Sequence, residues 1–247
     1  MLLPTGSFRI TPSLSWARNG SGDNSDETTV LGVALEAGLP WGMSASMRLP
    51  YIKKDFEISS NRGVGDLTLS LAKRLNNETD STPSFVVRGS YTHDSGDDPY
   101  LFPNIGSGFR SYSLALSGVK RFDPLVIYGD VSYSHAFAKS ATRRTKSGVV
   151  IPEFSGKITP GDTIGVGLGV SLAATPDISL DVGVSLDRSE KTKFESGFKS
   201  SSSKEGYINL GAGIVLTKNL FLSLSASAGI TDDATDAIFS VALPYRF

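Results

Sequence analysis

The chain has 247 residues, with 24 lysines and arginines against 25 acidic residues and a formal net charge of -1. This balance gives no electrostatic reason to expect nucleic acid as a partner. Cysteine is absent, which excludes a disulfide framework, a thiolate metal site and a cysteine nucleophile. No apolar run approaches the roughly 18 residues of a membrane-spanning helix.

Apolar and polar residues alternate with a period of two along most of the chain, which is typical of β-strands. The clearest case is TIGVGLGVSLA, which places Ile164, Val166 and Leu168 on one face and glycines on the other. We predict about twelve strands, at residues 7–18, 28–38, 42–53, 64–74, 84–93, 109–121, 124–137, 161–174, 177–188, 205–217 and 219–231, with the last running from Ile238 to Phe247.

The connections between these strands alternate in length. Tight turns such as GLPWG, RFDP, ATPD and TKN lie on one side. Long polar segments such as NGSGDNSDET, KDFEISSNRGVG and DSGDDPYLFPNIGSG lie on the other. Short periplasmic turns and long extracellular loops are characteristic of outer-membrane barrels.

A soluble β-sandwich would show the same alternation, but three features favour a membrane barrel. The strands are longer than the about five or six residues usual in sandwiches. The aromatic residues of the apolar row gather near strand ends, as in interfacial girdles, and the strand number is even. We therefore expect residues 1–247 to form one all-β, up-and-down antiparallel barrel in the bacterial outer membrane, in contact with its lipids and closed because lipid tolerates no open sheet edge.

The polar row then lines the lumen. Its charged members are balanced in sign, unlike the one-sided ring of an ion-selective porin. Reflection across the turns places Glu36 opposite Arg9 and Asp66 opposite Arg48, which predicts cross-strand ion pairs; a polar track for cargo is the alternative. The predicted pore-lining charges are Arg9, Glu36, Arg48, Asp66, Arg74, Arg88, Asp130, Asp181, Asp187 and Arg246.

Small residues form a second part of the predicted pore lining: Gly165, Gly167, Gly169, Ser223, Ser225 and Ser227. A twelve-stranded barrel is also wider than the eight-stranded barrels that side chains can fill. We therefore expect space in the lumen for water, a substrate, a folded-in loop or a plug. The connection 138–160, with Arg143, Arg144 and Lys146, is the candidate for a lid, and a solvated surface loop is the alternative.

Catalytic machinery is not evident in the sequence. The two histidines, His93 and His135, fall on the outward row by parity, whereas Ser134 falls on the opposite face. The acidic segments DSGDD and DDATD are weak candidates for Ca²⁺, because acidic loop tips are usually solvated. We expect no enzyme activity, no cofactor and no metal.

Three stretches, LLPTGSFRITPSLSW, GKITPGDTIGVGLGVSLAATPDISLDVGVSLDRSEKTK and GITDDATDAIFSVALPYRF, resemble a family of outer-membrane transporter barrels labelled meta-pathway-of-phenol-degradation-like. Within that group the chain also resembles the outer-membrane pore of the functional-amyloid (Fap) secretion system. The resemblance implies a twelve-stranded barrel, assembly as a homotrimer, and an upstream plug and coiled coil. The first residues, MLLPTGSFRI, lack the pattern of a signal peptide, so we expect these upstream parts to be absent here.

Three functions are open at this point. Export of unfolded amyloid subunits through the lumen is favoured, because glycines, serines and charges of both signs suit an extended polar chain. Passive uptake of small solutes, aromatic ones among them, is the rival, and a structural or adhesive barrel without transport is the third. The closing residues Tyr245 and Phe247 also resemble the signal that the barrel-assembly machinery recognises.

Overall fold

The computed structural model describes residues 2–20, 25–57, 59–143 and 154–247, and every regular element in these ranges is a β-strand. No helix in these ranges is long and apolar enough to cross a membrane. The strands of the barrel wall are β1 (Phe8–Asn19), β2 (Asp26–Leu39), β3 (Met43–Phe56), β4 (Ser59–Val64), β5 (Thr68–Arg74), β6 (Ser84–Thr92), β7 (Ser111–Phe122), β8 (Leu125–Ala136), β11 (Thr163–Ala173), β12 (Ile178–Ser189), β14 (Ser203–Val215), β15 (Phe221–Gly229), β16 (Ala237–Ala242) and β17 (Tyr245–Arg246).

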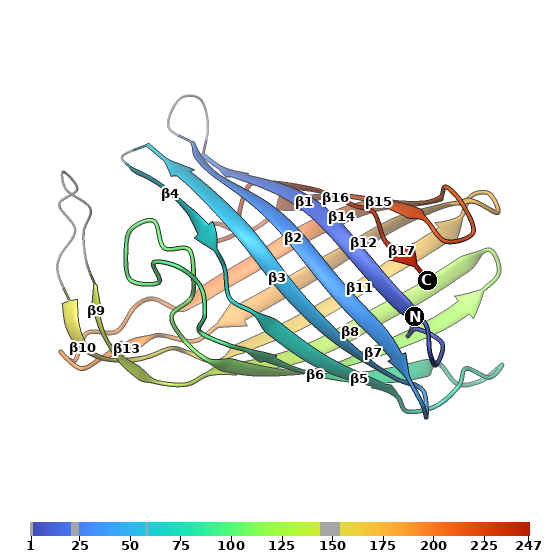
Figure 1. Cartoon of the computed structure of the whole chain (residues 1–247), viewed down its shortest axis with the longest axis horizontal. Coiled ribbons are helices and arrows are strands. Elements are labelled where there is room, and N and C mark those ends of the chain that lie inside the picture. The colour runs from blue at the N-terminus through green and yellow to red at the C-terminus, as the bar shows by residue number, and fades with distance from the viewer. Residues whose placement is uncertain (1, 21–24, 58, 144–153) are drawn as a thin grey trace.

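Each wall strand pairs antiparallel with its neighbour, and the sheet closes on itself (Figure 1). The seam joins β1 to β16 and β17, with Ser13 opposite Ala242 and Arg9 opposite Arg246. Because β4 and β5 form one interrupted strand, as do β16 and β17, the wall has 12 strands. The prediction of an all-β, antiparallel twelve-stranded barrel is confirmed.

The apolar row covers the outside of the barrel. Leu168 is 60% exposed and its neighbours along β11 and β12 are similarly bare, as expected for side chains solvated by lipid rather than buried in a core. Aromatic residues pack together near strand ends: Trp16 stacks on Phe239 with ring centroids 5.9 Å apart, and Tyr112 lies 5.7 Å from Phe137. These rings lie where the interfacial girdles were predicted.

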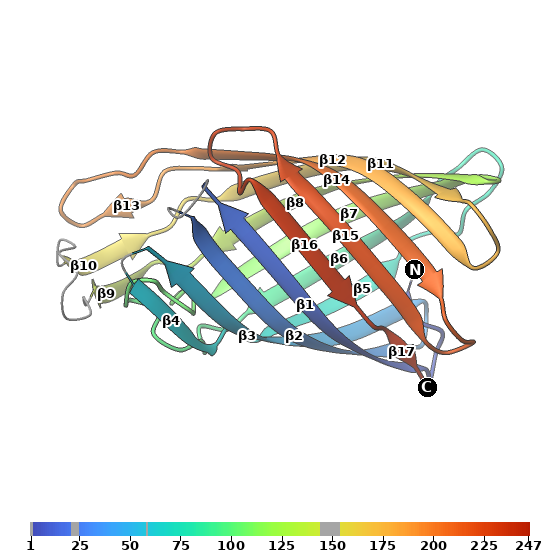
Figure 2. The ribbon, with the colours of Figure 1, turned by 90° about the horizontal axis from the view of Figure 1, so that it is seen from above.

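Two predicted loops contain strands. Residues on both sides of the expected loop at 54–63 are instead paired: β3 and β4 are in register from Tyr51 opposite Val64 to Phe56 opposite Ser59. This pairing extends the wall of the barrel at this position. In the connection 138–160, β9 (Lys139–Arg143) and β10 (Phe154–Thr159) pair with each other and with β13 (Lys193–Phe194) in a separate small sheet beyond the barrel (Figures 1 and 2). Period-two alternation is short in both segments, so their pairing was not predicted.

The N-terminal segment turns into the barrel at the end that carries the short turns. Gly6 N donates to Gly38 O (3.0 Å), and Leu2 and Leu3 are buried. Gly38 lies on the lumen-facing row of β2, and a side chain there would overlap the backbone of Pro4. Residues 4–6 therefore lie against the lumen-facing side of β2.

Candidate pore and its constriction

The predicted charged residues of the pore occupy the lumen-facing rows, on the side of the wall opposite the lipid-exposed row. Arg9 forms the expected ion pair with Glu36, its register partner on β2. Arg246 lies opposite Arg9 on the other side, so two arginines and one carboxylate meet at the seam. The other expected pair is absent: Asp66 accepts hydrogen bonds from backbone groups rather than from Arg48.

Apart from Glu36 on β2, which pairs with Arg9, and Asp66 beside β5, the lumen charges are sorted by sign round the barrel. The arginines Arg9, Arg48, Arg74, Arg88 and Arg246 lie on β1, β3, β5, β6 and β17, whereas Asp130, Asp181, Asp187 and Glu205 lie on β8, β12 and β14. In the strand order β3 and β12 are half a turn apart, so a cationic wall faces an anionic one. Counting charges in the sequence indicated balance and no net field; the topology adds a field directed across the lumen.

The glycine positions of the lumen do not leave the open space that we expected. A side chain at Gly169 would overlap the ring of Tyr128, and one at Gly211 would overlap the carboxylate of Asp181. At Gly167 a Cβ would lie 2.7 Å from an oxygen of Asp130, and at Gly165 it would lie 2.6 Å from Ser132 Oγ. These glycines therefore let neighbouring polar side chains lie flat against the wall.

The serines of β15 lie among polar and small residues of the neighbouring strands. Ser227 Oγ donates to Asn209 Oδ1 (2.7 Å) on β14, and Ser225 lies opposite Ser240 in register. Ser240 Oγ is 2.8 Å from Ser15 Oγ on β1, and Ser223 lies opposite Ala242. Ser227 thus bonds across the strands, whereas Ser223 and Ser225 lie opposite small residues of β16.

The long connection between β6 and β7 folds inward at the other end of the barrel; we call residues 94–110 the mouth loop. The loop lies beside β4 in both views (Figures 1 and 2). Asn61 and Gly63 lie on the lumen-facing row of β4, because their register partners Lys54 and Ile52 lie opposite to the row of the exposed Tyr51. The loop covers this side: Asn61 bonds to Pro103 O, and a Cβ at Gly63 would overlap Asp97. A folded-in loop therefore narrows the mouth of the barrel.

Three polar side chains fasten the mouth loop to the wall. Asp66, in the break between β4 and β5, accepts hydrogen bonds from Gly96 N (2.8 Å) and Ser107 N (2.6 Å). Asn61, only 8% exposed, donates to Pro103 O (3.0 Å), while Asp97 accepts from Val64 N (2.7 Å). Loop and wall are thus joined from both sides, through the buried Asn61 and through two aspartates that stay accessible to water.

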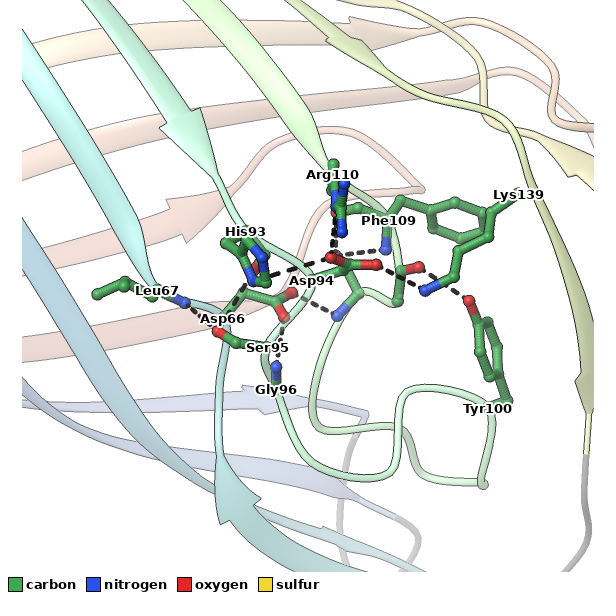
Figure 3. Close-up of polar contacts among 12 residues, drawn as sticks. Asp66, Leu67, His93, Asp94, Ser95, Gly96, Tyr100, Phe109, Arg110 and Lys139 are labelled. Atoms are coloured by element: carbon green, nitrogen blue, oxygen red, sulfur yellow. Dashed lines mark hydrogen bonds and ion pairs between the residues drawn. The ribbon is translucent and has the colours of Figure 1, made fainter.

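Figure 3 shows the outer attachment of the mouth loop, centred on Asp94. Its carboxylate is 2.9 Å from Arg110 Nε and 2.6 Å from Lys139 Nζ of β9, and its side chain is 7% exposed. Hydrogen bonds from Lys139 and then Arg110 hold the pKa of Asp94 well below its ordinary value. Lys139 also lies over the ring of Tyr100, 6.0 Å from its centroid, so the mouth loop and β9 share one cation.

The candidate lid is described only in part. Arg143 ends β9, opposite Phe154 of β10, whereas Arg144 and Lys146 lie outside the described residues. Within the described ranges the segment that enters the mouth is the one between β6 and β7. Its sequence, DSGDDPYLFPNIGSG, is rich in turn-forming residues, but turn composition does not show which side of the wall a loop covers.

The histidines lie on the outward face. His135 Nδ1 is 2.7 Å from Asp162 Oδ1, and Tyr133 donates to the other oxygen of Asp162 at 2.8 Å. Ser134 Oγ instead donates to Tyr112 O from the lumen-facing row. In the part of the chain that the structure describes, no serine therefore joins the His135–Asp162 pair.

The closed wall, the lipid-exposed apolar row, the aromatic girdles and the polar lumen define the class of this protein: it is a β-barrel of the bacterial outer membrane. The family described as "Putative MetA-pathway of phenol degradation" matches residues 25–247. The chain therefore belongs to that family.

Solved structures agree on the fold. The COG4313 outer membrane channel from Pseudomonas putida F1 superposes with a TM-score of 0.83 at 13% identity, covering 99% of this chain and 97% of that one. The translocator domain of the autotransporter NalP from Neisseria meningitidis gives 0.63 at 12% identity, covering 99% and 90%. The KdgM porin gives 0.53 at 12% identity, covering 97% and 99%. Identities this low extend the agreement to architecture alone.

Proposed function

We propose that the protein is a passive channel that admits small solutes through its lumen. The observation that carries the proposal is the mouth loop, which is fastened inside the wall by Asp66, Asn61 and Asp97. A fixed constriction selects by size, and its polar surroundings let hydrated solutes replace water contacts with protein contacts.

The chemistry of the lumen refines the class of solute. A cationic wall facing an anionic wall suits small molecules that carry polar or ionised groups, because each end of a dipolar solute finds complementary charge. The family's association with phenol degradation makes aromatic compounds with such groups the first candidates. The similarity to a COG4313 channel and a porin supports the same direction.

Export of unfolded amyloid subunits, the function favoured by the sequence, remains a prediction. A polypeptide would have to pass both the mouth loop and the N-terminal residues that lie in the opposite end of the lumen. Fibre formation by cells that lack the gene tests this function directly: undiminished extracellular fibres would exclude it.

The test of the channel is swelling of liposomes that contain the purified barrel, in a series of solutes of increasing size. We expect rapid swelling with small polar solutes and a sharp size limit. Liposomes that never swell faster than protein-free vesicles would contradict the proposal.

Asp66→Asn tests whether the mouth loop sets that limit. The variant loses a charge-assisted acceptor for backbone N–H groups, about 1.5–3 kcal/mol, which shifts the population of displaced loop about tenfold or more. Larger solutes should enter and single-channel conductance should rise. Asp80→Asn, in an exposed turn at the other end, is the matched control and should behave as the unmodified protein.

A further inference from the structure

The outer surface of the barrel carries a group of cations directly beyond the lipid-facing band. We define the basic cluster as Arg188, Lys191, Lys193, Lys199 and Lys204, on the end of β12, the start of β14 and the hairpin between them. All five side chains are exposed. Four of them line one hollow of about 290 Å³ together with Glu190 and Ser202.

Like charges in this cluster lie directly opposite one another. Arg188 pairs in register with Lys204, and Lys193 pairs with Lys199 across the hairpin. Cross-strand pairs of equal sign are destabilising unless another charge compensates them. Glu190 is the one carboxylate among the residues that line the hollow.

The basic cluster differs from other outward-facing cations at the same end of the barrel. Arg110 and Lys139 are both paired with Asp94, and Lys53 is paired with Asp55 at 2.6 Å. Among the described residues, no member of the basic cluster forms an ion pair. Their charge is therefore available to an anion from outside the protein.

The position of the cluster identifies the source of that anion. Arg188 follows Leu186 on the outward row of β12, and Lys204 precedes Gly206 and Ile208 on that of β14. Leu186 and Ile208 are each 43% exposed and belong to the lipid-facing band. Arg188 and Lys204 are the next outward-facing pair beyond this band, toward the long-loop end, which is the level at which lipid headgroups begin.

We propose that the basic cluster binds the phosphate groups of an outer-leaflet glycolipid, the lipid A part of lipopolysaccharide, whose acyl chains lie against Leu186 and Ile208. Arg188 and Lys204 contact the phosphate nearest the acyl chains. Lys191, Lys193 and Lys199 contact anionic groups farther from the bilayer. This site is separate from the lumen and does not depend on the proposed transport function.

The test uses the purified full chain in detergent, titrated with bisphosphorylated lipid A and followed by native mass spectrometry. The variants are Arg188→Gln with Lys204→Gln, and Lys193→Gln with Lys199→Gln. Removal of a cation near an anionic lipid surface weakens binding about fivefold, so each double variant should lose roughly 25-fold. Heat-dependent migration on gels checks that every variant is a folded barrel.

A matched control is available on the other side of the barrel. Lys53 and Arg62 also lie opposite each other on the outward row, and Lys53 already has Asp55 as its partner. Lys53→Gln with Arg62→Gln removes the same charge and should leave lipid A binding unchanged. An equal loss in this control, or no loss in either cluster variant, would overturn the proposal.

Two further probes separate a lipid from a soluble anion. Dephosphorylated lipid A should bind at least about tenfold more weakly than the bisphosphorylated form, because the contacts to phosphate are lost. Inorganic pyrophosphate should compete poorly, since it has no acyl chains to contact the lipid-facing band. Equal binding of the dephosphorylated lipid, or competition by pyrophosphate at equal concentration, would show that the occupant is not a phosphorylated glycolipid.

Discussion

Glycine in the mouth loop allows two backbone segments to approach within contact distance. A Cβ on Gly96 would lie 2.6 Å from the Cα of Gly106, and a Cβ on Gly106 would lie 2.9 Å from the Cα of Gly96. Real Cβ atoms do not come this close to backbone, so no side chain can relieve the overlap by rotating. The fold of the loop therefore depends on these two positions.

Gly96→Ala should separate the two segments and weaken the hydrogen bonds that Gly96 N and Ser107 N donate to Asp66. The cost of such overpacking is about 1–3 kcal/mol. Hydrogen exchange of the amides of residues 96 and 107 should speed up accordingly. Gly89→Ala, which meets nothing within 4 Å, is the control, and equal exchange in both variants would contradict this account.

The sequence predicts the direction of single side chains well and their partners poorly. The alternation of side chains along a strand placed Arg9 and Glu36 in the lumen. Their equal distance from the turn between two adjacent strands predicted that they would pair, as they do. The same alternation placed Asp66 on the polar row, but its partners are backbone groups of Gly96 and Ser107, which lie 30 and 41 residues later in the chain. Period-two alternation carries no information about such contacts.

A cluster of ion pairs joins the mouth loop to the small sheet beyond the barrel. Asp94 joins the mouth loop to β9 through Lys139, and Arg110, the last residue of the mouth loop, completes the group. Asp94→Ala should release β9 from the mouth loop and leave two cations without their shared partner. Limited proteolysis near residue 139 should then be faster, whereas Asp123→Ala, in a turn at the other end, should change nothing.

The ion pair between Asp94 and Lys139 should persist in mild acid. Because the folded-state pKa of Asp94 is depressed, the stability it contributes is present above the unfolded value of about 4 and is lost as pH falls through the lower folded value. Proteolysis near residue 139 should therefore be equal at pH 7 and pH 5 and should accelerate only in stronger acid. Acceleration between pH 7 and pH 5 would show that another group controls the link.

The terminal residue Phe247 is predicted to act in assembly of the barrel rather than in its stability. Phe247 donates its N–H to Phe8 O (2.9 Å), but its ring is 68% exposed and contacts Tyr245 edge-to-face at 4.8 Å. Phe247→Ala should therefore slow the appearance of folded barrel in cells much more than it lowers the thermal midpoint of barrel already formed. Phe8→Ala, which removes a similarly exposed ring nearby, is the control; equal slowing in both would exclude a role for Phe247 as an assembly signal.

The whole molecule separates its charges across the lumen while keeping them balanced. Arginines outnumber carboxylates on β1 to β6, where Glu36 and Asp66 are the exceptions, and carboxylates line β8 to β14. The sequence contains this pattern, but only the closed strand order turns it into facing walls. The barrel itself was predictable, because alternation, strand length and loop asymmetry all report on lipid contact. The constriction was not, because it is made by contacts between segments of irregular backbone.

Balanced walls predict weak ion selectivity in the unmodified protein. Arg88 is exposed to the lumen on β6, so Arg88→Glu should make the channel prefer cations by weakening one wall and adding charge of the other sign. Reversal potentials in a salt gradient measure this preference. Lys218→Glu, outside the lumen in a short turn, should leave it unchanged, and an equal shift in both variants would point to a surface effect.

The inward course of the N-terminal residues has a practical consequence for purification. Leu2 and Leu3 are buried and precede Pro4, whose backbone lies against the lumen-facing Gly38, so a peptide fused ahead of them would begin inside the barrel. A histidine tag at that end would be inaccessible to resin and would alter the conductance being measured. The turn at residues 217–219 is exposed and short, and an affinity sequence inserted there would leave both the lumen and the closing strand intact.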